Sequence, residues 1–257
     1  MKGISYNLKG KVVLVTGGSR GIGLELVKTL AAGKALVAFC ARKQEGLETA
    51  LKELQEPGVP ENILAVQAHI AREAEVENLF QKVMERFGRL DVLINNVGIN
   101  LPTPPLADTD YALWQKIIDT NLNGTFLCSR GAARIMRPQQ RGKIINISSI
   151  ASRKASPGMG IYGIAKAGIE MLTRVLAAEL APYNIQVNAV APAMVKTEFS
   201  RPFWSNPETF STITSQIPLG RIANPGEIVH PVLFLASEAS GFITGETIIV
   251  DGGATIV

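Results

Sequence analysis

Residues 11–32 read KVVLVTGGSRGIGLELVKTLAA, and this stretch decides the fold class. Its first seven residues form a short β-branched run that ends in glycine, which is the pattern of a buried strand. After the glycine-rich turn, Ile22, Leu26 and Leu30 recur at helical spacing and predict a helix. A strand that leads through glycines directly into a helix is typical of the first unit of an α/β domain.

Apolar runs and helical patterns alternate along the rest of the chain. The further expected strands are ALVAFCA (35–41), ILAVQA (63–68), LDVLINN (90–96), GKIINIS (142–148), IQVNAVA (185–191) and TIIVDGG (247–253). The further expected helices are 44–56, which Pro57-Gly58 would end, 73–88, about 110–137, 161–181 and 225–237. We therefore expect one α/β domain over 1–257, a Rossmann-type doubly wound parallel sheet of about seven strands with helices on both faces.

One segment interrupts this alternation. Residues 193–217, AMVKTEFSRPFWSNPETFSTITSQI, carry Phe199, Phe203, Trp204 and Phe210. A long insertion between regular elements is usually a lid or a binding loop. We predict a substrate lid at about 193–217, with an oligomer contact as the alternative.

Composition limits the class of protein. The 257 residues are 46% hydrophobic and 19% charged, which suits one large core. The net charge is +4, but Lys and Arg are scattered and never form a run of five, so we expect no nucleic-acid partner. The N-terminal MKGISYNLKGK lacks the apolar stretch of a signal peptide, and no apolar run approaches the roughly 20 residues that span a bilayer. We expect a cytoplasmic protein with no membrane partner.

Cysteine and histidine are scarce. Cys40 and Cys128 have no spacing that suggests metal ligands or a disulfide framework, so both are expected to be small core residues in a reducing compartment. His69 and His230 lie too far apart in sequence to suggest a zinc site. We therefore expect no metal.

The turn TGGSRGIG (16–23) predicts a dinucleotide site. Its glycines permit a tight turn and let the backbone approach a diphosphate at a helix N-terminus, where free N–H groups and the helix dipole favour negative charge. An acidic residue at the end of the second strand would bind the adenosine ribose and favour NAD. The chain instead reads FCARKQ, with Arg42 at that point and Arg20 inside the turn. Two guanidiniums can pair with a 2′-phosphate, so we predict NADP(H), with NAD(H) possible if both are solvated.

YGIAK (162–166) places a phenol and an ammonium four residues apart, on one face of a helix. By itself this pair could be a half-buried surface contact. Its significance depends on the motifs that surround it.

Taken together, the motifs resemble those of the short-chain dehydrogenase/reductase family over nearly the whole chain. TGGSRGIG resembles the family's TGxxxGxG, NNVG (95–98) its NNAG, YGIAK its YxxxK and NAVAPAMVKT its NxVxPGxVxT, and IIVDGG resembles its closing strand. Asn121 lies where the family carries a catalytic Asn, and Ser149 stands thirteen positions before Tyr162, as in the family.

The resemblance implies hydride transfer between a nicotinamide and a carbonyl or alcohol. Tyr162 would be the general acid/base, and Lys166 would lower its pKa from about 10 and hold the nicotinamide ribose. Ser149 would bind the substrate oxygen. Asn121 would hold a water that connects Lys166 to solvent.

The resemblance also implies the cofactor residues and, less directly, the substrate residues. The implied cofactor residues are Gly17, Ser19, Arg20, Ile22, Gly23, Arg42, His69, Ile70, Asn96, Gly98, Tyr162, Lys166, Val195 and Thr197. The candidate pocket residues are Ser149, Ile150, Ala151, Met159, Tyr162, Met194, Phe199 and Trp204. Most pocket candidates are apolar, which suits a ketone or aldehyde with a hydrophobic part.

Three residues depart from the family pattern. Val97 replaces the Ala of NNAG, so a small backbone shift is expected beside the cofactor. Ala193 replaces the Gly of PG, so either the nicotinamide end sits differently or φ there is negative. His69 stands where the family has an Asp near adenine. The His69 side chain could contact adenine, or the contact could come only from the backbone of Ile70. The alternative is that His69 is a partly exposed residue at a strand end.

Several alternatives remain open at this point. The reductase could act on 3-oxoacyl thioesters or general ketones, or the chain could be an NAD(H)-dependent sugar, polyol or hydroxyacyl dehydrogenase. A non-catalytic NADP(H)-binding regulator is the alternative of another class. The family's helices at about 110–137 and 161–181 pair across subunits, so we predict a homotetramer, with a dimer as second choice.

Overall fold

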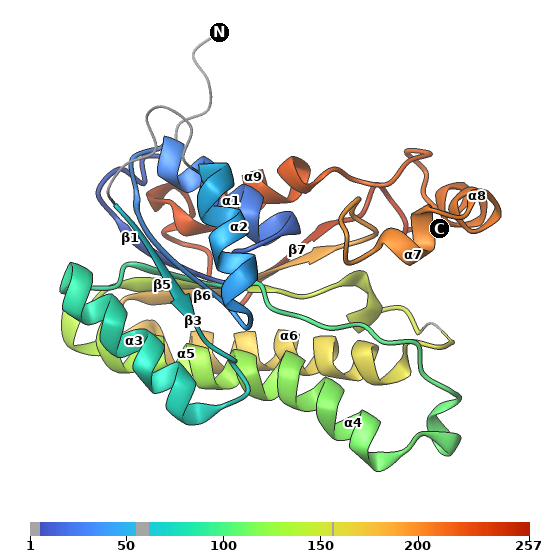
Figure 1. The fold of residues 1–257 in the computed structure, drawn as a ribbon, viewed down its shortest axis with the longest axis horizontal. Helices are drawn as coiled ribbons and strands as arrows, with labels where there is room; N and C mark the ends of the chain where they lie inside the picture. The colour runs from blue at the N-terminus through green and yellow to red at the C-terminus, as the bar shows by residue number, and fades with distance from the viewer. Residues whose placement is uncertain (1–5, 55–61, 156) are drawn as a thin grey trace, which may run out of the picture.

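The computed structural model describes residues 6–54, 62–155 and 157–257. Its seven strands form one parallel sheet in the order β3-β2-β1-β4-β5-β6-β7, which confirms the predicted architecture (Figure 1). The strands are β1 (Val12–Thr16), β2 (Leu36–Ala41), β3 (Ile63–Gln67), β4 (Val92–Asn95), β5 (Gly142–Ile147), β6 (Ile185–Pro192) and β7 (Thr247–Val250).

Helices cover both faces of this sheet. Figure 1 shows α1, α2 and α9 on one face and α3, α5 and α6 on the other. The helices are α1 (Gly21–Ala32), α2 (Gln44–Leu54), α3 (Glu73–Phe87), α4 (Tyr111–Ile118), α5 (Gly124–Gln139), α6 (Gly160–Leu180), α7 (Arg201–Trp204), α8 (Pro207–Ser215) and α9 (Pro225–Ala236). The expected end of α2 at Pro57-Gly58 lies outside the described residues.

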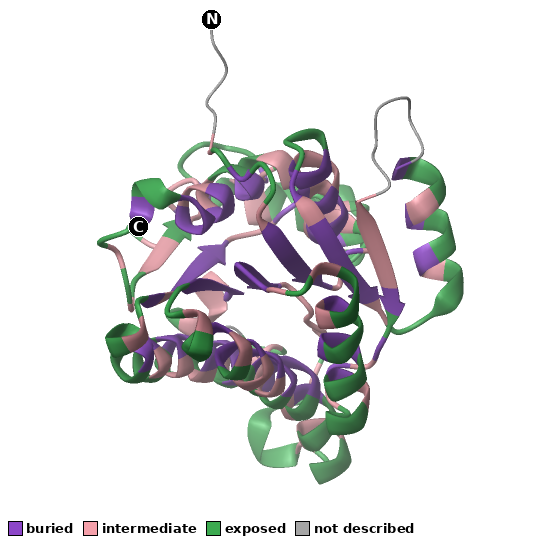
Figure 2. Cartoon of the chain, turned by 90° about the vertical axis from the view of Figure 1, so that its left-hand side faces the viewer, coloured by how far each residue is buried: buried purple, intermediate pink, exposed green. Residues whose placement is uncertain are grey.

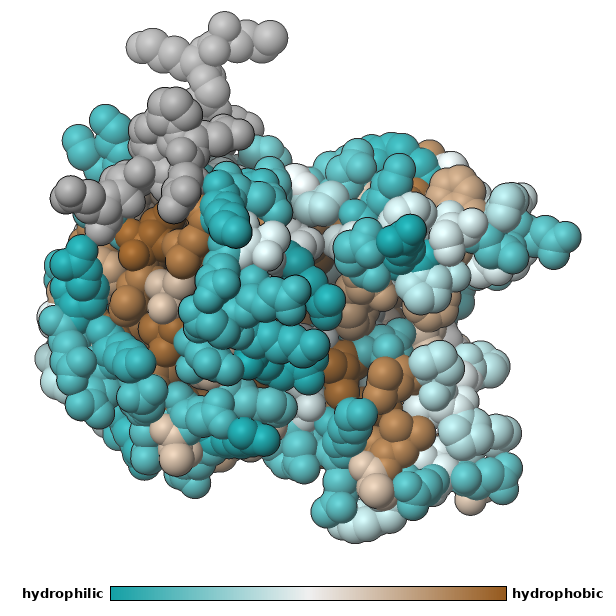
Figure 3. Space-filling model, viewed as in Figure 1, coloured by the Kyte–Doolittle hydropathy of each residue, from teal (hydrophilic) through white to brown (hydrophobic). Residues whose placement is uncertain are grey.

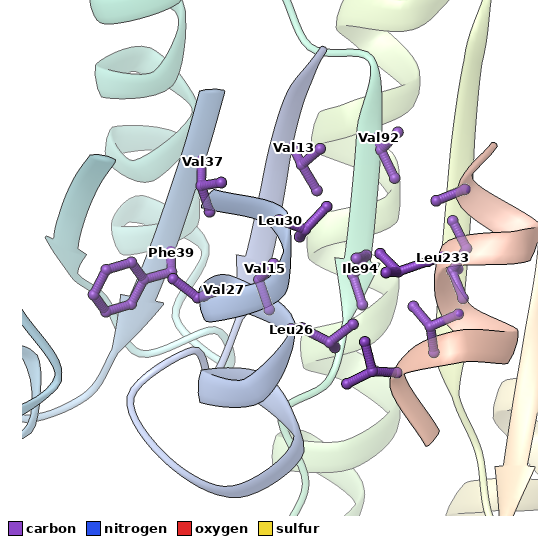
Figure 4. Close-up of a cluster of buried hydrophobic side chains, with 14 of the residues drawn as sticks. Val13, Val15, Leu26, Val27, Leu30, Val37, Phe39, Val92, Ile94 and Leu233 are labelled. Atoms are coloured by element: carbon purple, nitrogen blue, oxygen red, sulfur yellow. The ribbon is translucent and has the colours of Figure 1, made fainter. Parts of the chain in front are cut away.

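Alternate strand residues build two separate cores. Val13 and Val15 point to the face that carries α1, where Leu26 and Leu30 pack over them (Figure 4). Val12 and Leu14 point to the opposite face and pack with residues of α3 and α5. The strands are therefore buried on both sides, while the outer faces of the helices are exposed (Figure 2).

The strand order reverses beside β1. The chain builds β1, β2 and β3 outward in one direction and then returns to place β4 on the other side of β1. In open parallel sheets, ligands bind outside the carboxyl ends of the strands at such a switch point. The loops after β1 and β4 are therefore where a site is expected.

The helical stretch expected at about 110–137 is divided in three. A π-helical segment, η2 (Asp119–Asn123), separates α4 from α5 and contains Asn121. Single π-helical turns inside α-helices occur frequently at functional sites. The segment 193–217 is not regular sheet or long helix, and it carries only α7 and α8.

Candidate active site

A cavity of about 710 Å³ runs along the carboxyl ends of the strands. Its walls come from the residues that directly follow β1 to β6, and from the segment that contains α7 and α8. Figure 3 shows hydrophobic side chains gathered in the hollow between the α7–α8 lobe and the helices beneath it. The volume lies within the range of about 300–1,000 Å³ that is usual for ligand sites.

The glycine-rich turn forms one end of the cavity. Gly17 and Gly21 have φ of +67° and +56°, a conformation that favours glycine. A Cβ on Gly23 would stand 2.1 Å from the carbonyl oxygen of Gly17, so only glycine allows this packing. Among the described residues no side chain caps the start of α1, so its first N–H groups remain available to an anion. The turn therefore fits a dinucleotide diphosphate.

Asn96 supports the same turn from β4. Its Nδ2 atom donates hydrogen bonds to the carbonyl oxygens of Thr16 and Gly17, both at 3.1 Å, and its backbone N–H donates to Thr16 Oγ1. The resemblance implies that Asn96 contacts the cofactor. The structure shows that it also ties the loop after β4 to the loop after β1.

Cations gather at the end of the cavity that the glycine-rich turn forms. Arg20 and Arg42 both line it, and both are exposed. No ion pair within the described residues neutralises either of them, which leaves both guanidiniums able to bind a phosphate. Lys43 lines the same end and was not predicted, although Glu45 also lies there and offsets part of the charge.

His69 and Ile70 also line this end of the cavity. The His69 Nδ1 atom accepts a hydrogen bond from the backbone N–H of Ala71 at 3.3 Å. The pKa of His69 is lowered, chiefly by burial and then by the charges of Arg42 and Arg72. A neutral imidazole at this point can still exchange a hydrogen bond with a ligand.

Ser149, Tyr162 and Lys166 meet at the other end of the cavity. Ser149 caps η3 (Ile150–Ser152), the short turn after β5, and its hydroxyl lowers the pKa of Tyr162 of α6. The Lys166 Nζ atom lies 5.5 Å from the centroid of the Tyr162 ring and donates a hydrogen bond to the carbonyl oxygen of Ile147 at 2.8 Å. A hydroxyl, a phenol and an ammonium therefore converge from two elements onto one wall.

Burial changes the acidity of both ionisable groups. It raises the pKa of Tyr162 to about 12, while the Ser149 hydroxyl acts in the opposite direction. It lowers the pKa of Lys166 to about 8. For the protein groups alone, desolvation of the phenolate is the larger effect, so the lowering of the Tyr162 pKa by Lys166 together with a cationic nicotinamide stays a prediction.

Asn121 lies behind this centre and does not line the cavity. It is fully buried, and its Nδ2 atom donates hydrogen bonds to the carbonyl oxygens of Ile99 at 3.0 Å and Ile117 at 2.9 Å. Its Oδ1 atom accepts a hydrogen bond from the N–H of Ile99 at 3.1 Å. The side chain thereby fixes the loop after β4, and Gly98 on that loop faces Lys166.

The substrate end of the cavity is mostly apolar. Of the pocket candidates, the structure places Ser149, Ile150, Ala151, Met159, Tyr162, Met194 and Phe199 on its wall. Residues that were not predicted also line it, namely Asn100, Lys154, Phe203, Ile213, Gln216 and Ile217. Phe203 was visible in the sequence as an aromatic residue of the insertion, whereas the others carry no motif.

Trp204 does not line the cavity in this structure, so a substrate contact through its ring stays a prediction. Its Nε1 atom donates hydrogen bonds to the Thr197 carbonyl oxygen and to Ser200 Oγ, both at 3.1 Å. Its ring packs with Ile217 and Ile222 in a small separate core. Trp204 therefore fixes the loop that carries Thr197, which does line the cavity, as does Val195.

Comparison with known proteins identifies the family. A family model described as Enoyl-(Acyl carrier protein) reductase matches residues 17–255. A 3-oxoacyl-[acyl-carrier-protein] reductase of Synechocystis sp. is 39% identical over 96% of this chain and 97% of its own length. The chain is a short-chain dehydrogenase/reductase.

Two further relatives show how varied the members of this family are. A 3alpha-hydroxysteroid dehydrogenase of Mediterraneibacter gnavus is 38% identical to this short-chain dehydrogenase/reductase, over 96% of this chain and 98% of its own length. The crystal structure of a gluconate 5-dehydrogenase from Burkholderia cenocepacia in complex with NADP and tartrate has a TM-score of 0.92 and 33% identity, over 98% of both chains. The family and its oxidoreductase chemistry are shared, whereas the named substrates differ.

The structure explains two departures of this short-chain dehydrogenase/reductase from the family motifs. Ala193 is not among the described residues with positive φ, so the expectation of a negative φ at this position is confirmed. Val97 lies against the turn, since its Cγ2 atom would stand 3.0 Å from a Cβ on Gly17. Neither residue contacts Ser149, Tyr162 or Lys166 through a hydrogen bond in the described part of the chain.

The described residues of this short-chain dehydrogenase/reductase offer neither a metal site nor a membrane-spanning helix. Across 6–54, 62–155 and 157–257, no three His, Cys, Asp or Glu side chains are grouped so that they could hold a metal ion. In the same described residues, no helix is both long enough and apolar enough to cross a bilayer.

Proposed function

We propose that this chain is an NADP(H)-dependent oxidoreductase that transfers a hydride between the nicotinamide and a ketone, an aldehyde or a secondary alcohol. The observation that carries the proposal is the convergence of the Ser149 hydroxyl and the Tyr162 phenol on one cavity wall, with the Lys166 ammonium 5.5 Å from the centroid of the Tyr162 ring. A phenol and a hydroxyl that face the same space can both bind one carbonyl oxygen.

In this mechanism, Tyr162 is the general acid/base. The bound nicotinamide supplies or accepts the hydride, and its oxidised ring is a cation that favours the phenolate. In reduction, the Tyr162 hydroxyl gives its proton to the carbonyl oxygen, and in oxidation the phenolate removes the proton of the alcohol. Ser149 donates a hydrogen bond to the same oxygen and stabilises its developing charge.

Lys166 has two roles in this proposal. One N–H is held by the Ile147 carbonyl oxygen, which leaves two for the nicotinamide ribose. Its positive charge stabilises the phenolate form of Tyr162. Asn121 acts without contacting the substrate. It fixes the loop after β4, and a water held near it would connect Lys166 to solvent.

NADP(H) is the proposed cofactor because Arg20 and Arg42 are exposed on the cavity and free of ion pairs within the described residues. No carboxylate stands at Arg42, where an acidic residue would bind the ribose hydroxyls of NAD. The gluconate 5-dehydrogenase structure was solved with NADP, which supports the same choice. The remaining cofactor contacts are proposed for Gly17, Ser19, Ile22, Gly23, His69, Ile70, Asn96, Gly98, Val195 and Thr197.

The proposed substrate has an apolar body next to its carbonyl. Met159, Met194 and Phe199 line this end of the cavity. A polyhydroxylated substrate would leave hydroxyls without partners against such a wall, which costs free energy. The polyol dehydrogenase alternative is therefore the weaker one, and the named substrates of the 3-oxoacyl and hydroxysteroid relatives fit the wall better.

We assign the substrate lid to 193–217 within a single domain over 1–257. Phe199 of this segment is exposed and Phe203 is only partly buried although both line the cavity, so a ligand between them and the wall would bury more apolar surface. Gain of apolar contact on binding is the physical reason for such a segment to close.

A homotetramer is also proposed. Phe126 of α5 and Ile164, Met171 and Val175 of α6 are apolar and exposed by 42–55%. Apolar residues gathered on adjacent helices favour a subunit interface. Light scattering of the purified protein should give four times the chain mass of 27.5 kDa at micromolar concentration, and Val175→Lys should lower it. A monomeric wild-type protein would reject the tetramer.

The first experiment is a side-by-side titration of the protein with NADPH and NADH, followed by intrinsic fluorescence. We expect tighter binding of NADPH. A panel of cyclic and aliphatic ketones then tests turnover, with Tyr162→Phe as the inactive variant that still binds NADPH. Cofactor binding without turnover of any carbonyl or alcohol would favour the non-catalytic regulator.

A further inference from the structure

Glu170 is a buried carboxylate that the proposed mechanism does not use. It lies on α6, two turns after Tyr162 and one turn after Lys166, and it is only 5% exposed. Burying a charge costs free energy, and a protein with an apolar side chain in such a place is often no less stable than one with the charged side chain. The position of Glu170 therefore needs a reason other than stability alone.

The partners of Glu170 come from the loop that carries Ser149. Ser148 Oγ lies 3.4 Å from Glu170 Oε1, and Ser152 Oγ lies 2.5 Å from the same atom. The Ser152 hydroxyl is also 2.5 Å from the carbonyl oxygen of Ser149, and the Ser152 N–H donates to that oxygen at 3.0 Å. Glu170 thus contacts residues on both sides of Ser149.

Charge strengthens this connection. The guanidinium of Arg153, the residue after η3, donates to Glu170 Oε2 at 3.1 Å from one nitrogen and to Oε1 at 3.4 Å from Nε. Arg174 of α6 lies 3.8 Å from Oε2. Charge-assisted bonds to both carboxylate oxygens fix direction as well as distance.

We propose that Glu170 is a positioning residue for the reaction: its carboxylate fixes the Ser149 loop against the helix that carries Tyr162. The inference rests on the proposed function. Ser149 and Tyr162 stand on different elements, so the distance between their oxygens depends on what joins the loop to the helix. Close backbone contact supplies one connection, since a Cβ on Gly163 would stand 2.7 Å from the Ala151 carbonyl oxygen. Ser148 Oγ supplies a second, since it lies 3.2 Å from the Lys166 carbonyl oxygen. Glu170 supplies a further one, at the far side of the loop.

Small displacements at a reaction centre have large effects, of the order of a hundredfold in rate for 1 Å. Glu170→Gln removes the ion pair with Arg153 while keeping the volume of the side chain. We expect kcat for ketone reduction to fall about tenfold or more, with little change in the Kd of NADPH. Glu179→Gln is the matched control, because Glu179 lies on the same helix and is exposed. It should leave kcat unchanged.

A pH profile separates positioning from a general loss of structure. The Ser149 hydroxyl, which shares the cavity wall with Tyr162, lowers the pKa of that phenol. If Glu170→Gln displaces Ser149, the pH at which alcohol oxidation is half-maximal should move upward, by about half to one unit. Ser149→Ala should cause the same upward shift, and Glu170→Gln added to Ser149→Ala should cause no further one.

The outcomes distinguish this inference from the proposed function. A wild-type protein that turns over no carbonyl or alcohol would reject the proposed function. If the wild type is active and Glu170→Gln leaves kcat and the pH profile unchanged, the role of Glu170 is overturned. The role is also overturned if Glu170→Gln shifts the pH profile equally in the wild type and in Ser149→Ala. If Glu170→Gln does not fold by circular dichroism, Ser152→Ala removes only the bridging hydroxyl and should give the same direction of change.

Discussion

Gly98 and Asn121 lie so close together that a methyl group on Gly98 would stand 3.0 Å from the Asn121 Oδ1 atom. The same methyl group would stand 3.4 Å from the Nζ atom of Lys166. Asn121 cannot easily move away, because its side chain makes hydrogen bonds to Ile99 and Ile117. A side chain as small as that of alanine would therefore disturb the support of the proposed catalytic lysine.

Gly98→Ala should lower both stability and turnover. We expect the free energy of unfolding to fall by about 1–3 kcal/mol, as for overpacking elsewhere, and kcat to fall with it. Urea denaturation and steady-state kinetics measure the two effects. Gly226→Ala is the control, because nothing lies within 4 Å of its added Cβ and the residue is helical. Equal behaviour of the two variants would contradict the steric explanation.

Lys166 should make stability depend on pH. Its pKa is 10.5 in the unfolded chain and about 8 when buried, so the unfolded state binds more protons between these values. The free energy of unfolding therefore rises as pH increases from about 8, by a total of about 3 kcal/mol over the window. Tyr162 acts in the opposite direction only above pH 10, because its pKa is raised from 10 to about 12.

Chemical denaturation at several pH values between 7 and 9.5 should show this rise in the wild type. Lys166→Met should reduce it to the part that Lys143 contributes, because burial also lowers the pKa of Lys143, and should abolish turnover. Lys116→Met, at an exposed position of α4, should retain the rise. A slope as steep in Lys166→Met as in the wild type would mean that a group other than Lys166 causes the rise.

Arg42 should distinguish NADPH from NADH. If its guanidinium pairs with the 2′-phosphate, Arg42→Ala should weaken NADPH binding about tenfold or more and leave NADH binding almost unchanged. Arg20→Ala should act in the same way. Lys52→Ala, at an exposed position of α2, is the control for a general loss of positive charge. Equal weakening of both cofactors by Arg42→Ala would remove the basis for NADP(H) specificity.

Sequence patterns were sufficient for the fold because they reflect local physics. The strand, glycine turn and helix of 11–32 each follow from residue spacing and from glycine's access to positive φ, as at Gly17. Repetition of such units leaves few topologies other than a doubly wound sheet. Ser149, Tyr162 and Lys166 could be predicted because they stand inside ordered motifs.

Properties that arise from packing could not be predicted in this way. The pKa of Tyr162 depends on how much apolar surface surrounds the phenol, and the residues adjacent to Tyr162 in the sequence do not determine that surface. The role of Glu170 depends on which loop folds onto α6. Trp204 supports the cavity wall in this structure, and the sequence could not show this because an aromatic residue in an insertion can either line a cavity or pack behind its wall.

Trp204 should affect the cofactor more than the substrate. Its indole N–H holds the Thr197 carbonyl oxygen and Ser200 Oγ, and Ser200 Oγ in turn donates to the Val195 carbonyl oxygen. Trp204→Phe keeps most of the ring and removes only this N–H. Since Val195 and Thr197 line the cavity, we expect NADPH affinity to fall several-fold, as for loss of one or two hydrogen bonds.

The relative kcat/KM values of small and large ketones should remain unchanged in Trp204→Phe, because the ring does not border the cavity. Trp114→Phe, in α4 and also outside the cavity wall, is the matched control and should change neither quantity. A variant with altered preference among ketones and unaltered NADPH affinity would identify Trp204 as a substrate contact. It would also mean that the 193–217 segment closes far enough to bring the indole against the substrate.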